Sequence, residues 1–199
     1  MADFEEVSVK LRSGLEVKIH AWQSHDDAQP LVIVAPNSSA ADWDHFVSFL
    51  PSSHAPILAN VSSSSELLML IWEIGEPVLV LVQGQPAVDI ASGFIATDPA
   101  AAFGIIVCDG EISSDQAGDM HDILILVLRG RQGKTLSHPA AVKMHELLKN
   151  STLIEPENCG DFPAKDNPNA AVSAINMFLA GASGTFDEGS DADPIDPKA

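Results

Sequence analysis

Positive charge is scarce in this sequence. Its 199 residues include 10 Lys and Arg against 28 Asp and Glu, which gives a formal net charge of −18 at pH 7. No lysine or arginine occurs between Lys18 and Arg129, although this stretch contains 14 carboxylates. So acidic a chain repels nucleic-acid phosphates and anionic lipid, and we expect neither as a partner. The same field favours cations and basic proteins, while solubility alone is the simpler explanation of the charge.

Cysteine and long apolar runs are also scarce. Two cysteines, Cys108 and Cys159, are too few for a disulfide framework, and we expect buried free thiols, as in a reducing compartment. No run of 18 apolar residues occurs, and the first ten residues lack the apolar core of a signal peptide. The sequence therefore predicts a cytoplasmic protein without a membrane span.

The apolar content is enough for one α/β domain. Residues 6–12 and 15–22 alternate apolar and polar, which predicts an antiparallel hairpin. Apolar strands then alternate with amphipathic helices, with strands expected at 31–35, 56–61, 78–82, 103–108, 123–128 and 152–155 and helices at 43–50, 66–74, 88–96, 138–150 and 168–179. This order predicts a mostly parallel sheet of about eight strands, covered on both faces. The domain is expected to span residues 1–183, and the polar, Gly- and Pro-rich residues 184–199 to form a disordered acidic tail.

The domain is organised around residues 77–94, PVLVLVQGQPAVDIASGF. A wholly apolar strand leads into a turn at residues 83–87, and a helix is expected from Val88. A strand, sharp turn and helix of this kind present a catalytic serine in one large group of enzymes. Whether this turn carries a nucleophile is therefore the central question.

Five segments in order make the sequence resemble the α/β-hydrolase family over roughly residues 5–180. They are LVIVAPNSSAADWDHFVSFL, VLVLVQGQPA, IIVCDG, ILILVLRGRQG and CGDFPAKDNPNAAVSAINMFL. The resemblance implies a three-layer core with a His-Gly turn after the third strand and a Gly-x-Ser-x-Gly nucleophile turn after the fifth. It also implies an acid after the sixth or seventh strand and a histidine after the eighth.

The nucleophile position lacks a reactive side chain. In one register Gln85 replaces the serine, in the other Pro86 does, and neither is a nucleophile. The first register is favoured because the family turn holds its nucleophile in a strained, left-handed conformation that proline cannot adopt. Pro86 then occupies the next position, whose backbone N–H donates to the oxyanion in family members, and proline has no N–H.

The other catalytic positions implied by the resemblance are also altered. Asp161 stands in place of histidine, and a carboxylate with an ordinary pKa of about 4 is a poor base for activating a serine. Asp109 matches an alternative acid position after the sixth strand, whereas residues 129–133, RGRQG, contain no aspartate after the seventh. Residues 35–36 read Ala-Pro instead of His-Gly, and Asn37 matches an asparagine of some relatives, such as haloalkane dehalogenases.

Further chemistry has little support in the sequence. Family members commonly carry a helical cap after the sixth strand, but here the polar residues 109–122 make the whole connection, so no cap and a shallow pocket are expected. The acidic residues of that segment lack the spacing of a calcium loop, and Ser92 lies inside a predicted helix. Four scattered histidines show no metal-binding spacing: His45, His54, His138 and His145. We expect neither metal nor cofactor.

The sequence thus favours a non-catalytic α/β-hydrolase homologue with no catalytic residues. It is expected to bind a small molecule through Asn37, Gln85, Asp109 and Asp161, or a basic protein through its acidic face, with an exposed sheet edge as a route to oligomers. One alternative is a weak or unconventional esterase acting on small neutral or cationic esters. Another is a stable protein without a selected activity.

Overall fold

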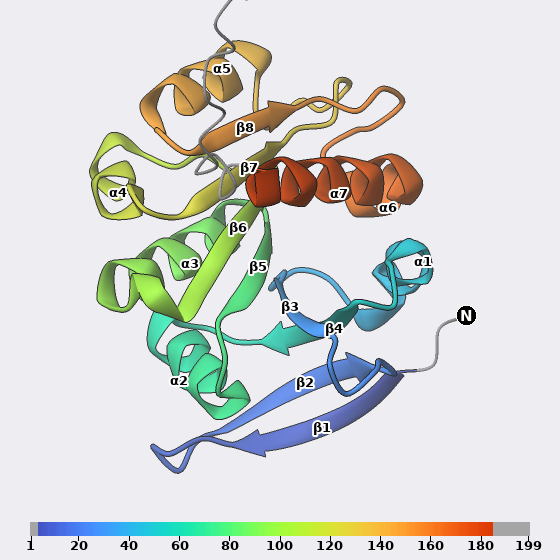
Figure 1. The fold of residues 1–199 in the computed structure, drawn as a ribbon, viewed down its shortest axis with the longest axis vertical. Coiled ribbons are helices and arrows are strands. Elements are labelled where there is room, and N and C mark those ends of the chain that lie inside the picture. Colours follow the sequence, from blue (N-terminus) through green and yellow to red (C-terminus); the bar gives the residue numbers. More distant parts are fainter. Residues whose placement is uncertain (1–3, 185–199) are drawn as a thin grey trace, which may run out of the picture.

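An eight-stranded sheet runs through the molecule, in the order β1-β2-β4-β3-β5-β6-β7-β8 (Figure 1). The structure is a computed structural model that describes residues 4–184. The strands are β1 (Phe4–Lys10), β2 (Glu16–Trp22), β3 (Gln29–Val34), β4 (His54–Asn60), β5 (Val78–Gln83), β6 (Ala102–Cys108), β7 (Leu124–Leu128) and β8 (Ser151–Ile154). β2 runs antiparallel to β1 and β4, and the other neighbours are parallel. The predicted hairpin and mostly parallel sheet are confirmed.

Helices cover both faces of the sheet, which gives three layers (Figure 1). One face packs against α2 (Ser64–Ile74), α3 (Gln85–Thr97), α4 (Ser114–Ala117) and α5 (His138–Leu147). The other packs against α1 (Asp44–Phe49), α6 (Pro163–Asp166) and α7 (Pro168–Gly184). Within residues 4–184 the connections also contain three short 3-10 helices: η1 (Ala40–Asp42), η2 (Pro99–Ala101) and η3 (Gly118–Met120).

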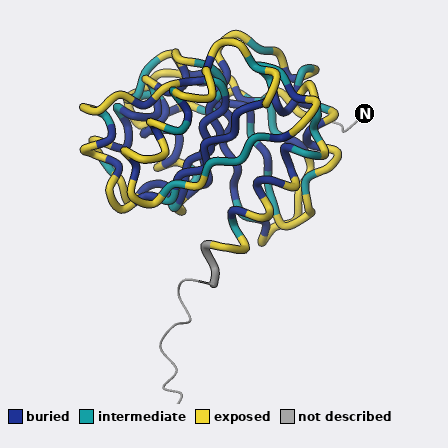
Figure 2. Tube along the Cα trace, turned by 90° about the horizontal axis from the view of Figure 1, so that it is seen from above, coloured by how far each residue is buried: buried dark blue, intermediate teal, exposed yellow. Residues whose placement is uncertain are grey.

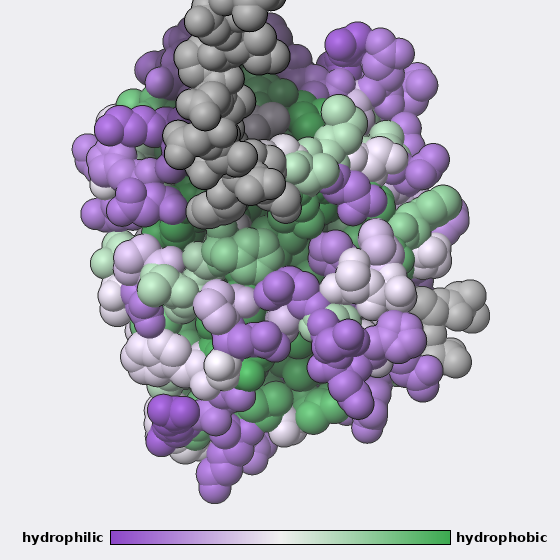
Figure 3. Space-filling model, viewed as in Figure 1, coloured by the Kyte–Doolittle hydropathy of each residue, from purple (hydrophilic) through white to green (hydrophobic). Residues whose placement is uncertain are grey.

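The continuous apolar run of β5 follows from its place in the middle of the sheet. Successive side chains of a strand point to opposite faces, and both faces here are covered. Val80 and Val82 pack on the side of α2 and α3, whereas Leu79 and Leu81 pack on the side of α1 and α7. Figure 2 shows the buried core through the middle of the domain and exposed residues around it. In Figure 3, hydrophilic side chains cover much of one face, and apolar ones show in hollows between them.

Several helices differ from the sequence expectation. α3 begins at Gln85 and not at Val88, because Pro86 suits the first turn of a helix, where its missing N–H has no partner to lose. The crossing from β6 to β7 carries α4 and η3, and α6 precedes α7; these short helices were not predicted. No helical cap is inserted between β6 and β7, as expected.

The C-terminal helix is longer than its amphipathic pattern indicates. α7 continues to Gly184, so the predicted acidic tail lies outside the described residues except for its first residue. Among the helices of residues 4–184, none is long and apolar enough to cross a membrane.

Candidate functional site

The loops that follow the parallel strands meet at one edge of the sheet. Because β3, β5, β6, β7 and β8 are parallel, the segments after their carboxyl ends share that edge. Every site residue predicted from the sequence lies in one of these segments. In α/β folds this edge is where ligands and catalytic groups are usually placed.

In the turn between β5 and α3, the residue with positive φ is Gly84, and glycine adopts this conformation without strain. Gly84 has φ 80° and ψ 165° and caps α3, whereas Gln85 and Pro86 are not among the described residues with positive φ. From the sequence, this conformation was predicted for Gln85, one residue too late. The residue after the positive-φ position is therefore Gln85, which keeps its backbone N–H. The predicted loss of an oxyanion donor at Pro86 thus does not follow. Gly84 has no side chain, and the position still lacks a nucleophile.

Close packing against this turn explains the glycine at position 110 in the next loop. The Gly84 N–H donates to the Cys108 carbonyl at 2.8 Å, which ties the turn to the end of β6. A Cβ on Gly110 would lie 2.4 Å from Cγ2 of Val88 and 3.4 Å from the Gly84 backbone. The loop after β6 thus lies directly against the turn after β5, and little room remains between them.

The Gln85 side chain fastens this loop in place. Its Nε2 donates to Oδ1 of Asp89 at 2.9 Å and to the carbonyl of Glu111 at 3.0 Å, and its Oε1 accepts the Glu111 N–H at 2.9 Å. Both ends of the amide therefore bind the chain itself. Gln85 was predicted as a ligand-binding residue, and its contacts in the structure are those of a loop clamp.

Asp161 holds a neighbouring loop in a similar way. Its Oδ1 accepts the backbone N–H groups of Lys134 and Thr135, the latter at 2.9 Å. These hydrogen bonds, that of Thr135 above all, lower the pKa of Asp161 below its ordinary value. A carboxylate that stays charged is a hydrogen-bond acceptor only, which makes Asp161 unsuited to take up a proton near neutral pH.

Asp109 lies nearby but in a different environment. It has φ 54°, is partly buried, and accepts the Leu136 N–H on Oδ1 at 3.2 Å. Burial raises its pKa to about 6, and the charge of Asp161 adds to this. The structure thus brings two of the four predicted ligand-binding residues together around residues 134–136.

Arg129 occupies the place after β7 where the family acid was sought. It is 8% exposed, and its Nε donates to the Leu136 carbonyl at 2.6 Å. Its two terminal nitrogens donate to Oε1 of Glu155 at 2.7 Å and to the Gly133 carbonyl at 3.1 Å. A fork of five N–H donors suits this set of acceptors, so the guanidinium shapes the loop after β7.

Glu155 completes this network. Burial opposes its charge, but hydrogen bonds from His138 and Arg129 outweigh burial and lower the pKa of Glu155. Nδ1 of His138 lies 2.8 Å from Oε2 of Glu155. Arg129 was not predicted as a structural residue, although the sequence carries one signal for it. A basic residue directly after the apolar run ILILVL, with a carboxylate after the next strand, indicates a paired charge at the strand ends.

Asn37 and Gln83 complete the edge. Asn37 is exposed in the turn after β3, and no side-chain hydrogen bond found among the described residues joins it to the other three predicted site residues. Gln83 was not predicted; its Nε2 donates to the Asp161 carbonyl at 2.9 Å, while its buried Oε1 has no hydrogen-bond partner within residues 4–184. Asn37 and Gln85 thus share no hydrogen-bonded loop with Asp109 and Asp161.

The four predicted site residues, Asn37, Gln85, Asp109 and Asp161, line none of five hollows on the described surface. One hollow of about 390 Å³ lies beside them at the same edge, lined by Pro36, Asn60, Val61, Ser62, Pro86 and Ile90.

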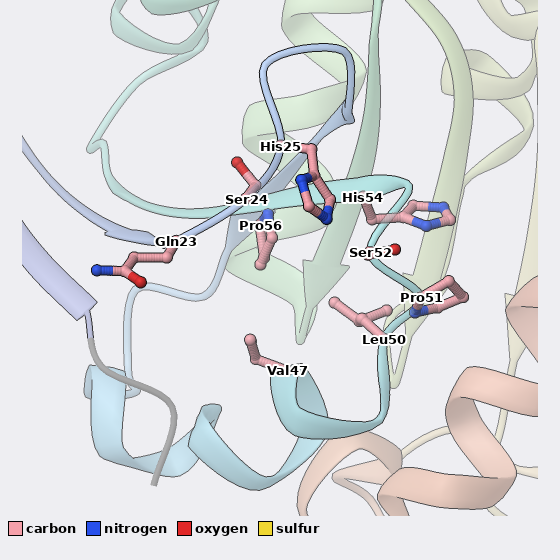
Figure 4. Close-up of a pocket in the computed structure, with 9 residues that line it drawn as sticks. All are labelled: Gln23, Ser24, His25, Val47, Leu50, Pro51, Ser52, His54 and Pro56. Carbon is pink, nitrogen blue, oxygen red and sulfur yellow. The ribbon is translucent and has the colours of Figure 1, made fainter.

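Another hollow lies at the opposite edge of the sheet. It has a volume of about 270 Å³ and lies between the segment before β3 and the segment joining α1 to β4 (Figure 4). His25 and His54 are its titratable lining residues, and burial lowers the pKa of His54. Two imidazoles without a carboxylate or thiol beside them make a poor metal site. Within residues 4–184 no group of three or more His, Cys, Asp or Glu is placed to hold a metal ion.

The two cysteines are buried free thiols, as predicted. Burial raises the pKa of Cys108 above its ordinary value and that of Cys159 to about 11. The Cys159 Sγ lies 3.8 Å from the Pro163 carbonyl, to which it donates. Because the thiolate is the nucleophile, neither thiol substitutes for the missing serine.

Solved structures with the same architecture cover almost the whole chain. E-2-(acetamidomethylene)succinate hydrolase superposes with a TM-score of 0.74 at 10% identity, over 89% of this chain and 100% of the other. The protein has the α/β-hydrolase fold. An esterase from Thermogutta terrifontis (TM-score 0.71, 12% identity, 89% of this chain and 98% of the other) and a carboxylesterase from Bacillus subtilis (0.70, 12%, 90% and 92%) share it. No family model and no curated protein matches the sequence. At 10–12% identity, the likeness concerns the fold.

Proposed function

We propose that this α/β-hydrolase-fold protein is non-catalytic and acts as a binding or interaction module. The observation that carries the proposal is Gly84, since the residue with positive φ in the turn after β5 has no side chain to attack a substrate. Without a nucleophile the covalent route of ester hydrolysis is closed.

The neighbouring polar groups support the same conclusion. Gln85 and Asp161 direct their side chains to backbone groups of adjacent loops, and Arg129 does so after β7. Because these groups are already hydrogen-bonded and line none of the five hollows described above, their contacts favour a protein partner over a small molecule held at this edge.

Chemical labelling tests the loss of catalysis. The protein is incubated with a fluorophosphonate probe and, separately, with nitrophenyl acetate and butyrate, with an active esterase as positive control. We expect no labelling and no turnover above the buffer rate. Labelling of one serine, or turnover that one substitution abolishes, would overturn the proposal.

One observation favours the esterase alternative. Asp109 has a pKa of about 6, which suits general base catalysis near neutral pH. If the nitrophenyl esters are hydrolysed, the comparison of wild type with Asp109→Asn decides between the two functions. Loss of turnover in that variant establishes a water-mediated esterase in place of a binding module.

A further inference from the structure

An apolar groove lies at the edge of the sheet opposite the loops described above. It is bounded by the end of α2, by η2 and by the segment that enters β5, and its volume is about 600 Å³. We call it the Trp72 groove; its lining residues are Arg12, Ile71, Trp72, Gly75, Glu76, Pro77, Asp98, Ala100 and Ala101. Ile71 and Ala101 are buried and belong to the core, so the groove opens directly onto it.

Trp72 is exposed yet fixed in orientation. Its residue is 44% exposed, whereas Trp22 and Trp43 are 4% and 0% exposed. The indole Nε1–H donates to Oδ2 of Asp98 at 3.0 Å, which ties the ring to the segment before η2. A rigid, half-exposed tryptophan next to an apolar hollow loses little entropy on binding, and tryptophan is enriched among the residues that dominate interface energies.

The rim of the groove is negatively charged. Glu76 and Asp98 line it, and the described residues offer neither of them an ion-pair partner. α2 also ends here: Gly75 adopts φ 86° and its N–H closes the last turn onto the Ile71 carbonyl. The partial negative charge of a helix C-terminus attracts cations, and the last turn of α2 contains no basic residue.

The protein already places one cation on this rim. Arg12, from the turn of the β1–β2 hairpin, pairs with Glu73 through Nε and Oε1 at 3.1 Å. This pair uses the Glu73 carboxylate, whereas Glu76 and Asp98 line the groove without an ion-pair partner among the described residues, and Asp98 accepts only the indole N–H on Oδ2. The charge that remains is complementary to a second basic side chain.

We propose that the Trp72 groove binds a basic, partly apolar segment of a protein partner. A lysine or arginine of that segment lies over the indole of Trp72 and faces Asp98 and Glu76, while an apolar neighbour fills the hollow over Ile71 and Ala101. A peptide segment suits the groove better than a small cation does, because one ammonium group cannot fill a volume of about 600 Å³. A basic protein segment is thus the partner class for the binding or interaction module proposed above, and it rests on that proposed function.

A synthetic peptide provides the test. The probe is acetyl-Arg-Leu-Arg-Leu-Lys-amide, added to the full chain at low salt. Because the other two tryptophans are buried, a change in tryptophan emission on titration reports on Trp72. Binding of a dye-labelled copy is followed by anisotropy. We expect a blue shift of the emission and saturable binding, and no binding of a peptide with Glu in place of the basic residues.

Matched variants separate the groove from the overall charge. Trp72→Ala and Asp98→Asn are expected to weaken binding about tenfold, with Trp72→Phe in between. Asp115→Asn removes one negative charge from the exposed α4 and is expected to leave binding within about twofold. Met177→Ala removes another exposed apolar side chain and is the control for Trp72. Circular dichroism and thermal melting check that each variant is folded.

Three results would overturn the inference: no binding, binding without a change in the Trp72 emission, or equal weakening by Asp98→Asn and Asp115→Asn. The last result would mean that the peptide responds only to net charge. Ester hydrolysis is measured on the same preparations, so failure of the groove and failure of the non-catalytic assignment are seen independently.

Discussion

Asp109 and Asp161 accept N–H groups of the same loop, residues 134–136, yet their pKa values move in opposite directions. Asp161 receives two backbone donors from Lys134 and Thr135, and its charged form is favoured. Asp109 receives one from Leu136, is more buried, and faces the charge of Asp161. The charge held on Asp161 therefore makes the charged form of Asp109 less favourable.

Asp109→Asn is expected to stabilise the protein at neutral pH. The folded-state pKa of about 6 lies above the ordinary 3.8, so the folded state binds more protons between these values. Stability of the wild type then falls as pH rises from about 4 to about 6, and the full penalty is present above pH 6. Asparagine keeps the acceptor for Leu136 and tolerates φ 54°. Because Asp109 is partly exposed, we expect a gain of about 1 kcal/mol at pH 7.5 that disappears near pH 4.

Urea unfolding of wild type and Asp109→Asn at pH 4, 5, 6 and 7.5 measures this difference. Asp109→Ala is the control, because alanine removes the charge but loses the acceptor and is strained at positive φ. A wild type that is more stable than Asp109→Asn at pH 7.5 contradicts the prediction.

Asp161→Ala is expected to destabilise the protein. It leaves the backbone N–H groups of Lys134 and Thr135 without their charged acceptor, which costs about 2 kcal/mol. The lowered pKa of Asp161 means that its contribution is present above about pH 4 and is lost as pH falls below that value. Asp161→Asn keeps one acceptor oxygen and should lose less. The measurement is denaturant unfolding at pH 7, and equal stability of wild type and Asp161→Ala contradicts it.

Gly84→Ala is expected to cost about 1–3 kcal/mol, because alanine is strained at φ 80°. Space is not the cause, since a Cβ there meets its nearest neighbour, Cδ of Pro86, at 3.9 Å. Gly118→Ala is a matched control: Gly118 has φ −58°, and a Cβ there meets nothing within 4 Å. Thermal melting should show a lower Tm for Gly84→Ala and an unchanged or slightly higher one for Gly118→Ala. A neutral Gly84→Ala would mean that the turn relaxes out of its positive-φ conformation.

Arg129→Ala is expected to destabilise the domain by about 3 kcal/mol. It leaves Glu155 without its closest partner and removes the donors to Leu136 and Gly133. Arg131 pairs with Glu157 on the surface, where both side chains are at least 60% exposed, so Arg131→Ala should change stability by less than about 0.5 kcal/mol. Denaturant unfolding of the two variants compares a buried with an exposed arginine. Similar losses in both would contradict the role given to Arg129.

The fold was accessible from the sequence because its central strands are buried on both faces. An apolar run such as residues 78–82, with glycine and proline on either side, indicates a buried strand. The alternation of apolar and polar residues in residues 6–22 identified the hairpin. Short helices such as α4 and α6 were missed because four residues give no periodicity to detect.

Details of the site depend on contacts between distant segments and were less accessible. The positive φ of Gly84 depends on its contacts with Cys108 and Gly110, which lie at the end of another strand and in another loop. The use of Gln85 as a clamp depends on Glu111, 26 residues away. That no nucleophile follows β5 was nevertheless evident from the sequence, because every residue from Gln83 to Val88 lacks a reactive hydroxyl or thiol.

The complete burial of β5 has a practical consequence. Val78 to Val82 are 0% exposed, and their strand is paired on both sides, by β3 and by β6. Their amide hydrogens cannot exchange with solvent through fraying of a loop or an edge strand; release requires the whole domain to open. Deuterium uptake in this segment therefore reports the global free energy of unfolding under native conditions, without denaturant, for the wild type and every variant named above.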